Sequence, residues 1–117
     1  MKTTQVLLSA MKVIRDTIGD GGSDVSVSNV ITLLVIAQNP ETPVVRVQEA
    51  LGLSQAACSR NLSRLSSGRP DKPGLRLIEQ YEDPYDRRNK IARLTPQGRE
   101  VVKALEAACS KFKVDAK

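Results

Sequence analysis

The chain has 117 residues with a net charge of +5, and 40 % of them are hydrophobic but only 3 % aromatic, which predicts one domain, 1–117, with an aliphatic core. Two cysteines and no histidine exclude a disulfide framework and the usual zinc spacings, and we expect no metal or cofactor. No apolar run of about 18 residues occurs and the N-terminal apolar stretch is too short for a secretory signal, so we expect a cytoplasmic protein without membrane spans.

The excess positive charge lies in the middle of the chain. Residues 46–103 contain 12 Lys+Arg and 7 Asp+Glu, whereas residues 1–45 carry a net charge of −1 and residues 104–117 carry +1. A basic segment favours a partner with phosphate groups. On its own, the excess is explained equally well as ordinary solubility charge.

The first predicted element is a helix over residues 3–18, with Thr3 or Thr4 as its N-cap. Its apolar residues form two adjacent stripes: Leu7, Met11, Ile14 and Ile18 in one, and Val6, Ala10 and Val13 in the other. Two stripes exceed what one core contact needs, so we expect one to meet a second subunit. The alternative is a helix packed between two others. The glycine-rich segment 19–22 should end this helix.

Residues 27–37, V-S-N-V-I-T-L-L-V-I-A, are almost continuously apolar. Periodicity does not distinguish a buried strand from a buried helix in such a run. The β-branched residues favour a strand, whereas the length and a possible cap at Ser26 or Ser28 favour a helix. Both interpretations remain open, and Asn39-Pro40 should end the element in either case.

Residues 44–65 have the pattern of a short helix, a turn at Gly52 and a second helix over 55–65 that Ser54 is placed to cap. The spacing of Cys58, Leu62 and Leu65 predicts the buried side of the second helix, and we expect Cys58 to be a packing residue rather than a redox sensor. This arrangement is a helix-turn-helix, whose second helix enters a DNA major groove. A plain helical hairpin is the alternative. The outer face then carries Gln55, Ala56, Ser59, Arg60 and Arg64.

Residues 66–76, S-S-G-R-P-D-K-P-G-L-R, contain two prolines and two glycines and are predicted to be a loop. Arg69, Lys72 and Arg76 make the loop basic, so it can follow a DNA backbone. A solvated surface loop is an equally good interpretation.

Residues 75–94 are predicted to form a two-stranded ribbon. Leu75, Leu77 and Ile78 open the first strand, residues 82–84 form the turn, and residues 86–88 form the tip. Thr95 can cap a final helix with Pro96 at its first position. We expect this helix to reach about residue 113. Its predicted apolar stripe is Val102, Leu105, Cys109 and Phe112.

Two segments resemble the MarR family of transcription regulators. Residues 47–65 look like the family's helix-turn-helix, and Asp86-Arg87-Arg88 followed by Leu94-Thr95-Pro96-Gln97-Gly98 resembles its wing signature. The resemblance covers roughly residues 27–105. It implies a mainly α fold with a small two-stranded β wing (α+β), that is, a winged helix-turn-helix, within a homodimer that binds a near-palindromic site.

The resemblance also implies roles for individual residues. In the wing, Arg88 would enter the minor groove, Asp86 would hold Arg88 by an ion pair, and Arg87 would contact a phosphate or the other side of the groove. We also expect Lys90 of the wing to contact DNA. A narrow minor groove attracts a guanidinium group in its own right. The residues that would face the major groove are Ser54, Gln55, Ala56, Ser59, Arg60 and Arg64.

The sequence departs from the family pattern in three places. The loop over residues 66–76 is longer than the usual step from recognition helix to wing, and the C-terminus is short for a dimerisation segment. One phenylalanine and two tyrosines give little to line an effector pocket, so we expect no small-molecule effector. The expected dimer contacts are Leu7, Met11, Ile14, Leu105, Cys109 and Phe112.

The sequence therefore predicts a double-stranded DNA-binding transcription regulator of prokaryotic, phage or plasmid origin, acting as a homodimeric repressor. An enzyme is not expected, because there is no histidine and no glycine-rich phosphate loop after a strand. Two alternatives remain. One is a phage- or plasmid-type accessory or architectural protein that binds DNA without operator specificity, and the other is a winged helix used for protein–protein contact.

Overall fold

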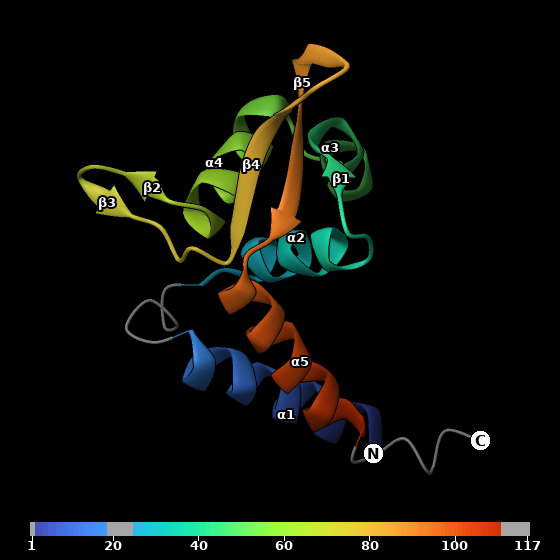
Figure 1. Ribbon diagram of the computed structural model, residues 1–117. Helices are drawn as coiled ribbons and strands as arrows, with labels where there is room; N and C mark the ends of the chain where they lie inside the picture. The colour runs from blue at the N-terminus through green and yellow to red at the C-terminus, as the bar shows by residue number, and fades with distance from the viewer. Residues whose placement is uncertain (1, 19–24, 111–117) are drawn as a thin grey trace. The chain divides into compact units, whose positions relative to one another are not determined.

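The computed structural model describes residues 2–18 and 25–110, and it divides the chain into two compact units (Figure 1). One unit is Met1–Val25 with Glu100–Lys117, and the other is Ser26–Arg99. In the described residues the elements are α1 (Lys2–Thr17), α2 (Val27–Ala37), β1 (Thr42–Pro43), α3 (Val44–Leu51), α4 (Gln55–Leu65), β2 (Gly68–Arg69), β3 (Lys72–Pro73), β4 (Ile78–Asp83), β5 (Asp86–Leu94) and α5 (Pro96–Ser110).

The apolar run at 27–37 is the helix α2, so the interpretation as a strand is wrong. Ser26 and Asn29 form a capping box: Ser26 Oγ accepts the Asn29 N–H at 3.1 Å, and Asn29 Oδ1 accepts the Ser26 N–H at 3.1 Å. Val30, Leu33 and Ile36 are buried at helical spacing. The cap satisfies two N–H groups that a helix start leaves free, and this outweighs the β-branched composition.

The predicted helix-turn-helix is present as α3 and α4. Gly52 ends α3 in the left-handed region, with φ of 64°, which a residue without a side chain adopts without strain. The hydroxyl of Ser54 accepts the Ala57 N–H at 3.1 Å and so caps α4. Cys58, Leu62 and Leu65 are buried, as predicted.

The wing is part of a three-stranded antiparallel sheet with the order β1-β5-β4. The strand β1 was not predicted, because its two residues carry no readable periodicity and pair with Ala92 and Ile91, which are distant in the sequence. On one face of the sheet, Ile78 and Ala92 are buried. The alternation along the strands therefore gives the wing an inner and an outer face.

Two boundaries of the predicted wing are wrong. Its first strand begins at Ile78 rather than Leu75, because the N–H groups of Leu75 and Leu77 donate to the carbonyl oxygens of Arg64 (2.9 Å) and Leu65 (2.8 Å) at the end of α4. The tip is Pro84-Tyr85, since Asp83 pairs with Asp86 across a two-residue turn. Residues 86–88, predicted as the tip, start the strand β5.

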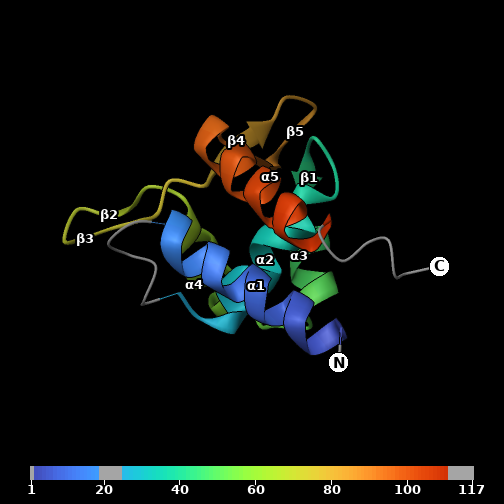
Figure 2. The same cartoon turned by 90° about the horizontal axis from the view of Figure 1, so that it is seen from below.

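The predicted loop at 66–76 contains a short hairpin, formed by β2 and β3, which pairs Gly68 with Pro73 and Arg69 with Lys72. Its base is closely packed, because a Cβ atom on Gly74 would lie 2.2 Å from the carbonyl oxygen of Ser66. Figures 1 and 2 show that this hairpin and the wing leave the Ser26–Arg99 unit in different directions. We call it the β2–β3 hairpin below.

The start of α5 explains the spacing of the segment L-T-P-Q-G. Thr95 Oγ1 accepts the Gly98 N–H at 3.0 Å, which confirms the predicted cap, and donates to the carbonyl oxygen of Arg76 at 2.7 Å. A Cβ atom on Gly98 would lie 1.9 Å from the carbonyl oxygen of Leu77. The threonine closes the helix end, and the glycine lets the helix approach the backbone that precedes β4.

In the other unit, several predicted details of α1 and α5 change. The helix α1 begins at Lys2, so Thr3 and Thr4 lie inside its first turn and do not cap it. The helix α5 ends at Ser110, and its buried residues are Val101, Leu105 and Ala108 instead of a stripe through Val102 and Cys109, which are only half-buried. Phe112 and the segment 19–22 lie outside the described residues.

Ile14 in α1 is buried, as Leu105 is in α5, so these two predicted dimer contacts belong to the interior of the chain. Leu7 and Met11 are 60 % and 42 % exposed, and the neighbouring Leu8 is 56 % exposed. Within the described ranges, no helix is long and apolar enough to cross a membrane.

Candidate nucleic-acid interface

The outer face of α4 is polar and open. Gln55, Ala56, Ser59 and Arg60 are all exposed, as the spacing of the buried residues predicted. Ser54 is also exposed, but its hydroxyl oxygen already accepts the capping hydrogen bond from Ala57. The face therefore combines two small side chains, which allow close approach, with an amide and a guanidinium group that can bond base edges.

The helix and the wing share one groove. A cavity of about 390 Å³ is lined by side chains of α3, of α4 and of the inner face of the wing. None of the residues that line it is acidic, and Arg88 and Lys90 give it a positive wall. The lining residues are Val44, Val45, Gln48, Gln55, Cys58, Ser59, Leu62, Gln80, Arg88, Asn89 and Lys90.

Asp86 organises the polar groups next to the wing tip. Its Oδ1 atom accepts from the backbone N–H and from Nε of Arg88, both at 3.2 Å, and its Oδ2 atom accepts from Nδ2 of Asn89 at 3.1 Å. The Arg88 side chain is 90 % exposed. An exposed ion pair stabilises a fold by only about 0–1 kcal/mol. The main effect of these hydrogen bonds is therefore to orient the Arg88 side chain.

The other predicted basic residues of the helix and the wing differ in their exposure and contacts. Arg87 and Lys90 are exposed on β5. In the strand register, Lys90 lies opposite Glu82 of β4. Arg64 is half-buried, and its Nη1 atom donates to the carbonyl oxygen of Pro73 at 3.3 Å. Arg64 thus contacts the β2–β3 hairpin at the end of α4, and its expected place at the major groove stays a prediction.

Arg69, Lys72 and Arg76, the predicted basic residues of the loop, also fall into two places. Arg69 and Lys72 are paired across the turn of the β2–β3 hairpin. Arg76 lies after the hairpin, where it is exposed and has a φ of 59°. The hairpin strands thus include two of the three predicted basic residues.

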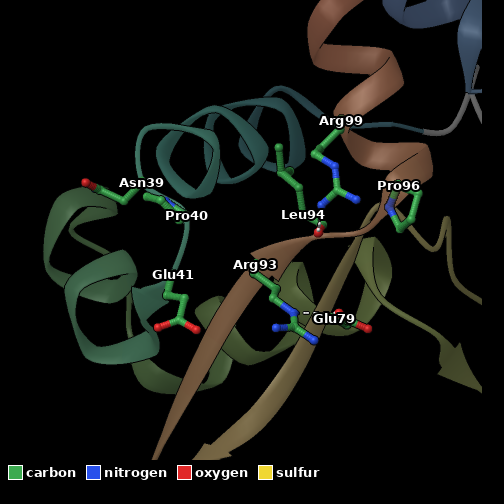
Figure 3. A pocket seen from close by; sticks show the side chains of 8 residues that line it. All are labelled: Asn39, Pro40, Glu41, Glu79, Arg93, Leu94, Pro96 and Arg99. Atoms are coloured by element: carbon green, nitrogen blue, oxygen red, sulfur yellow. Dashed lines mark hydrogen bonds and ion pairs between the residues drawn. The ribbon is translucent and has the colours of Figure 1, made fainter.

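The outer face of the wing has a second pocket, of about 750 Å³ (Figure 3). Arg93 Nε forms an ion pair with Glu79 at 2.6 Å, and Arg99 Nη1 donates to the carbonyl oxygen of Leu94 at 3.3 Å. Tyr81 donates to Glu41, and this bond raises the pKa of the tyrosine. The arginines are thus engaged within the protein, and no aromatic side chain lines the pocket.

Cys58 forms part of the floor of the groove but is buried, and the cost of burying a thiolate raises its pKa. Cys109, on α5, is half-buried. Within the described residues, no cluster of histidine, cysteine, aspartate or glutamate side chains is suited to hold a metal ion.

Three polar residues of the groove were not predicted from the sequence: Gln48, Gln80 and Asn89. Gln80 was readable in principle, because it lies two residues after the buried Ile78 and so on the same face of β4. The position of Gln48 depends on how α3 packs against the wing, and no local pattern in the sequence predicts that packing.

No protein-family model and no curated protein sequence matches the chain. Solved structures do match. Rv1404 from Mycobacterium tuberculosis superposes with a TM-score of 0.75 at 20 % identity, over 97 % of this chain and 70 % of that one. MepR of S. aureus, solved as a complex with DNA, gives a TM-score of 0.74 at 18 % identity, over 95 % and 81 %. MarR gives 0.63 at 21 % identity, over 97 % and 79 %.

These structures superpose on nearly the whole chain, whereas their sequences differ at about four positions in five. The likeness is therefore one of fold. The chain has the winged-helix fold of the MarR-like transcriptional regulators.

Proposed function

We propose that this chain is a transcription regulator that binds a specific site on double-stranded DNA as a homodimer. In this proposal α4 enters the major groove with Gln55, Ser59 and Arg60, while Arg88 enters the adjacent minor groove. The protein acts as a repressor by occupying its site, because exclusion of a polymerase requires no further partner.

The observation that carries the proposal is the shared groove between α4 and the wing. A duplex presents its major and minor grooves side by side, separated by a phosphate backbone. The groove of this protein places a polar helix face beside Arg88 and Lys90, without an acidic lining residue. The MepR structure, which contains DNA, supports duplex DNA as the partner of this arrangement.

The homodimer is supported by α1. Leu7, Leu8 and Met11 lie within five residues on this helix, and each is at least 42 % exposed. An exposed cluster of large apolar side chains is typical of a protein interface. We therefore assign Leu7 and Met11, together with Leu8, to the contact between two copies, and Cys109 of α5 remains a proposed neighbour.

The β2–β3 hairpin extends the proposed interface. Arg69 and Lys72 lie opposite each other in the hairpin register. In this proposal the hairpin and Arg76 contact the backbone next to the major groove, and they supply affinity without base preference.

The proposal is tested by gel shifts on genomic fragments of the source organism, titrated with salt and with competitor DNA. We expect one short inverted repeat near a promoter to be protected, with an affinity that falls steeply as salt increases. Equal binding to every duplex would favour an architectural role instead. Absence of binding at low salt would contradict both and favour a winged helix that contacts protein.

A further inference from the structure

Tyr85 is the most exposed large hydrophobic side chain among the described residues, with 96 % of its surface accessible. An aromatic ring normally buries a large area in a fold or an interface. The chain has only three aromatic residues, and one of them is at the tip of the wing. A tyrosine at this place contributes little to the fold and needs another explanation.

The turn itself does not require a tyrosine. Pro84 and Tyr85 form a two-residue connection between β4 and β5, and Tyr85 is not among the residues with positive φ. With proline at its first central position, such a turn accepts most residues at the second. The side chain at position 85 is therefore free to serve an interaction.

The direction of this side chain is constrained by the backbone. Asp83 Oδ1 accepts the Tyr85 N–H at 2.8 Å, which closes the turn from one side. Asp86 binds Arg88 and Asn89 on the other side. Both carboxylates next to the tip are thus occupied by hydrogen bonds within the wing, and the ring is presented on an ordered turn.

Tyr85 and Arg88 lie close together in the chain. Tyr85 is in the turn, and Arg88 follows near the start of β5, where the strand register is irregular. Charge alone does not draw the wing to DNA, since Arg87, Arg88 and Lys90 are balanced by Glu82, Asp83 and Asp86. The binding of the tip must therefore depend on which groups enter the groove.

We propose that Tyr85 enters the minor groove together with Arg88, so that the wing contacts DNA through a pair of side chains. The ring lies against the deoxyribose walls, and its hydroxyl group donates to the O2 or N3 acceptors that A·T pairs display there. The inference rests on the proposed function, and it adds a preference for A·T pairs next to the Arg88 contact.

The test uses the variant Tyr81→Phe, in which Tyr85 is the only tyrosine. This protein is labelled with 3-fluorotyrosine, and its single ¹⁹F resonance is followed while a short duplex of alternating A·T pairs is added at low salt. The anisotropy of a dye on the same duplex reports binding independently. We expect the resonance to move as the duplex binds, and to return when netropsin, a minor-groove ligand, displaces the wing.

Affinity measurements on the same duplex give a second readout. Tyr85→Ser should weaken binding about tenfold, within the range for loss of an aromatic contact to nucleic acid, whereas Tyr85→Phe should keep most of the affinity. Val27→Ser is the matched control, because it removes another exposed apolar side chain, at the start of α2. This control should bind like the unchanged protein.

The outcomes separate the inference from the function on which it rests. A duplex that binds while the ¹⁹F resonance stays in place, or that binds Tyr85→Ser as tightly as the unchanged protein, overturns the role of Tyr85 and leaves the regulator proposal intact. No binding of the duplex by any variant at low salt overturns both.

Discussion

At the scale of single residues, the proposed DNA interface depends on side chains that are positioned by hydrogen bonds and contribute little to stability. Asp86 makes three such bonds next to the wing tip, two of them to Arg88. Their free energy in an exposed place is small, but they restrict the rotamers of a long side chain before DNA arrives. Affinity for DNA and stability of the fold should therefore respond differently to changes at this site.

We predict that Arg88→Ala weakens DNA binding by about 1.5–3 kcal/mol, the range for a hydrogen bond to a charged group. Asp86→Ala should weaken binding less, because the guanidinium group remains but loses its orientation. The free energy of unfolding of both variants should lie within about 1 kcal/mol of that of the unchanged protein. Titration of a labelled duplex and urea denaturation measure the two quantities, with Arg15→Ala as a charge-matched control on α1. An equal loss from Arg15→Ala would show that only net charge matters.

The two thiols should differ in reactivity. Burial raises the pKa of Cys58, so less of its reactive thiolate is present near neutral pH than for an ordinary cysteine. We predict that a disulfide reagent such as Ellman's reagent modifies Cys109 first, and reaches Cys58 only after unfolding. In a Cys109→Ser variant the native protein should show no rapid reaction. A fast thiol in that variant would contradict the packing role of Cys58.

At the scale of elements, hydrogen bonds between the ends of helices and strands hold the parts of the proposed interface together. The end of α4, the base of the β2–β3 hairpin and the start of β4 are linked by backbone hydrogen bonds from Leu75, Arg76 and Leu77 to the carbonyl oxygens of Arg64, Ser66 and Leu65. Thr95 and Gly98 join α5 to the same backbone. The position of the wing relative to the recognition helix is thus fixed by main-chain contacts.

We predict that Gly98→Ala destabilises the protein by about 1–3 kcal/mol, because the added Cβ atom would collide with the carbonyl oxygen of Leu77. Thr95→Ala should cost about 1 kcal/mol through loss of the cap, and Thr95→Ser should restore most of it. Gln97→Ala, an exposed neighbour, should change stability by less than about 0.5 kcal/mol. Thermal unfolding compares all four, and a neutral Gly98→Ala would refute the close approach.

The β2–β3 hairpin gives a prediction about salt. If Arg69 and Lys72 each contact a phosphate, the double change Arg69→Gln/Lys72→Gln should lower the slope of log K against log salt by about 2, with base preference unchanged. The control is Lys12→Gln/Arg15→Gln, which removes two charges from α1. A slope that is unchanged by the hairpin variant would assign the hairpin to the solvated surface.

The elements also show which features a sequence of this kind reveals. Helices with a regular apolar spacing, such as α4, and caps such as Thr95 were predicted correctly, because their signals are local. The run at 27–37 was ambiguous, since an almost fully apolar segment has no readable period, and its length and the cap at Ser26 favoured the helix that forms. The strand β1 and the hydrogen bond from the Arg64 side chain to the Pro73 carbonyl oxygen depend on tertiary contacts. No local pattern predicts them.

At the scale of the whole molecule, the proposed site requires two copies. A near-palindromic DNA site presents two half-sites about one helical turn apart, so each must be met by one recognition helix. The exposed residues of α1 supply an apolar surface for that association. We predict that Leu7→Asp/Met11→Asp gives a monomer that stays folded, since both side chains are exposed. Sedimentation and circular dichroism test this, with Thr4→Asp/Lys12→Asp as the control on the same helix.

The central claim is that one face of the protein reads the major groove with α4 and the minor groove with Arg88. Selection of bound duplexes from a random-sequence pool, followed by hydroxyl-radical footprinting of the enriched site, tests this most directly. The account predicts an inverted repeat with half-sites about 10 base pairs apart. It also predicts minor-groove protection beside each half-site that Arg88→Ala removes. A pool without any enriched sequence, or a footprint that Arg88→Ala leaves unchanged, would contradict the account.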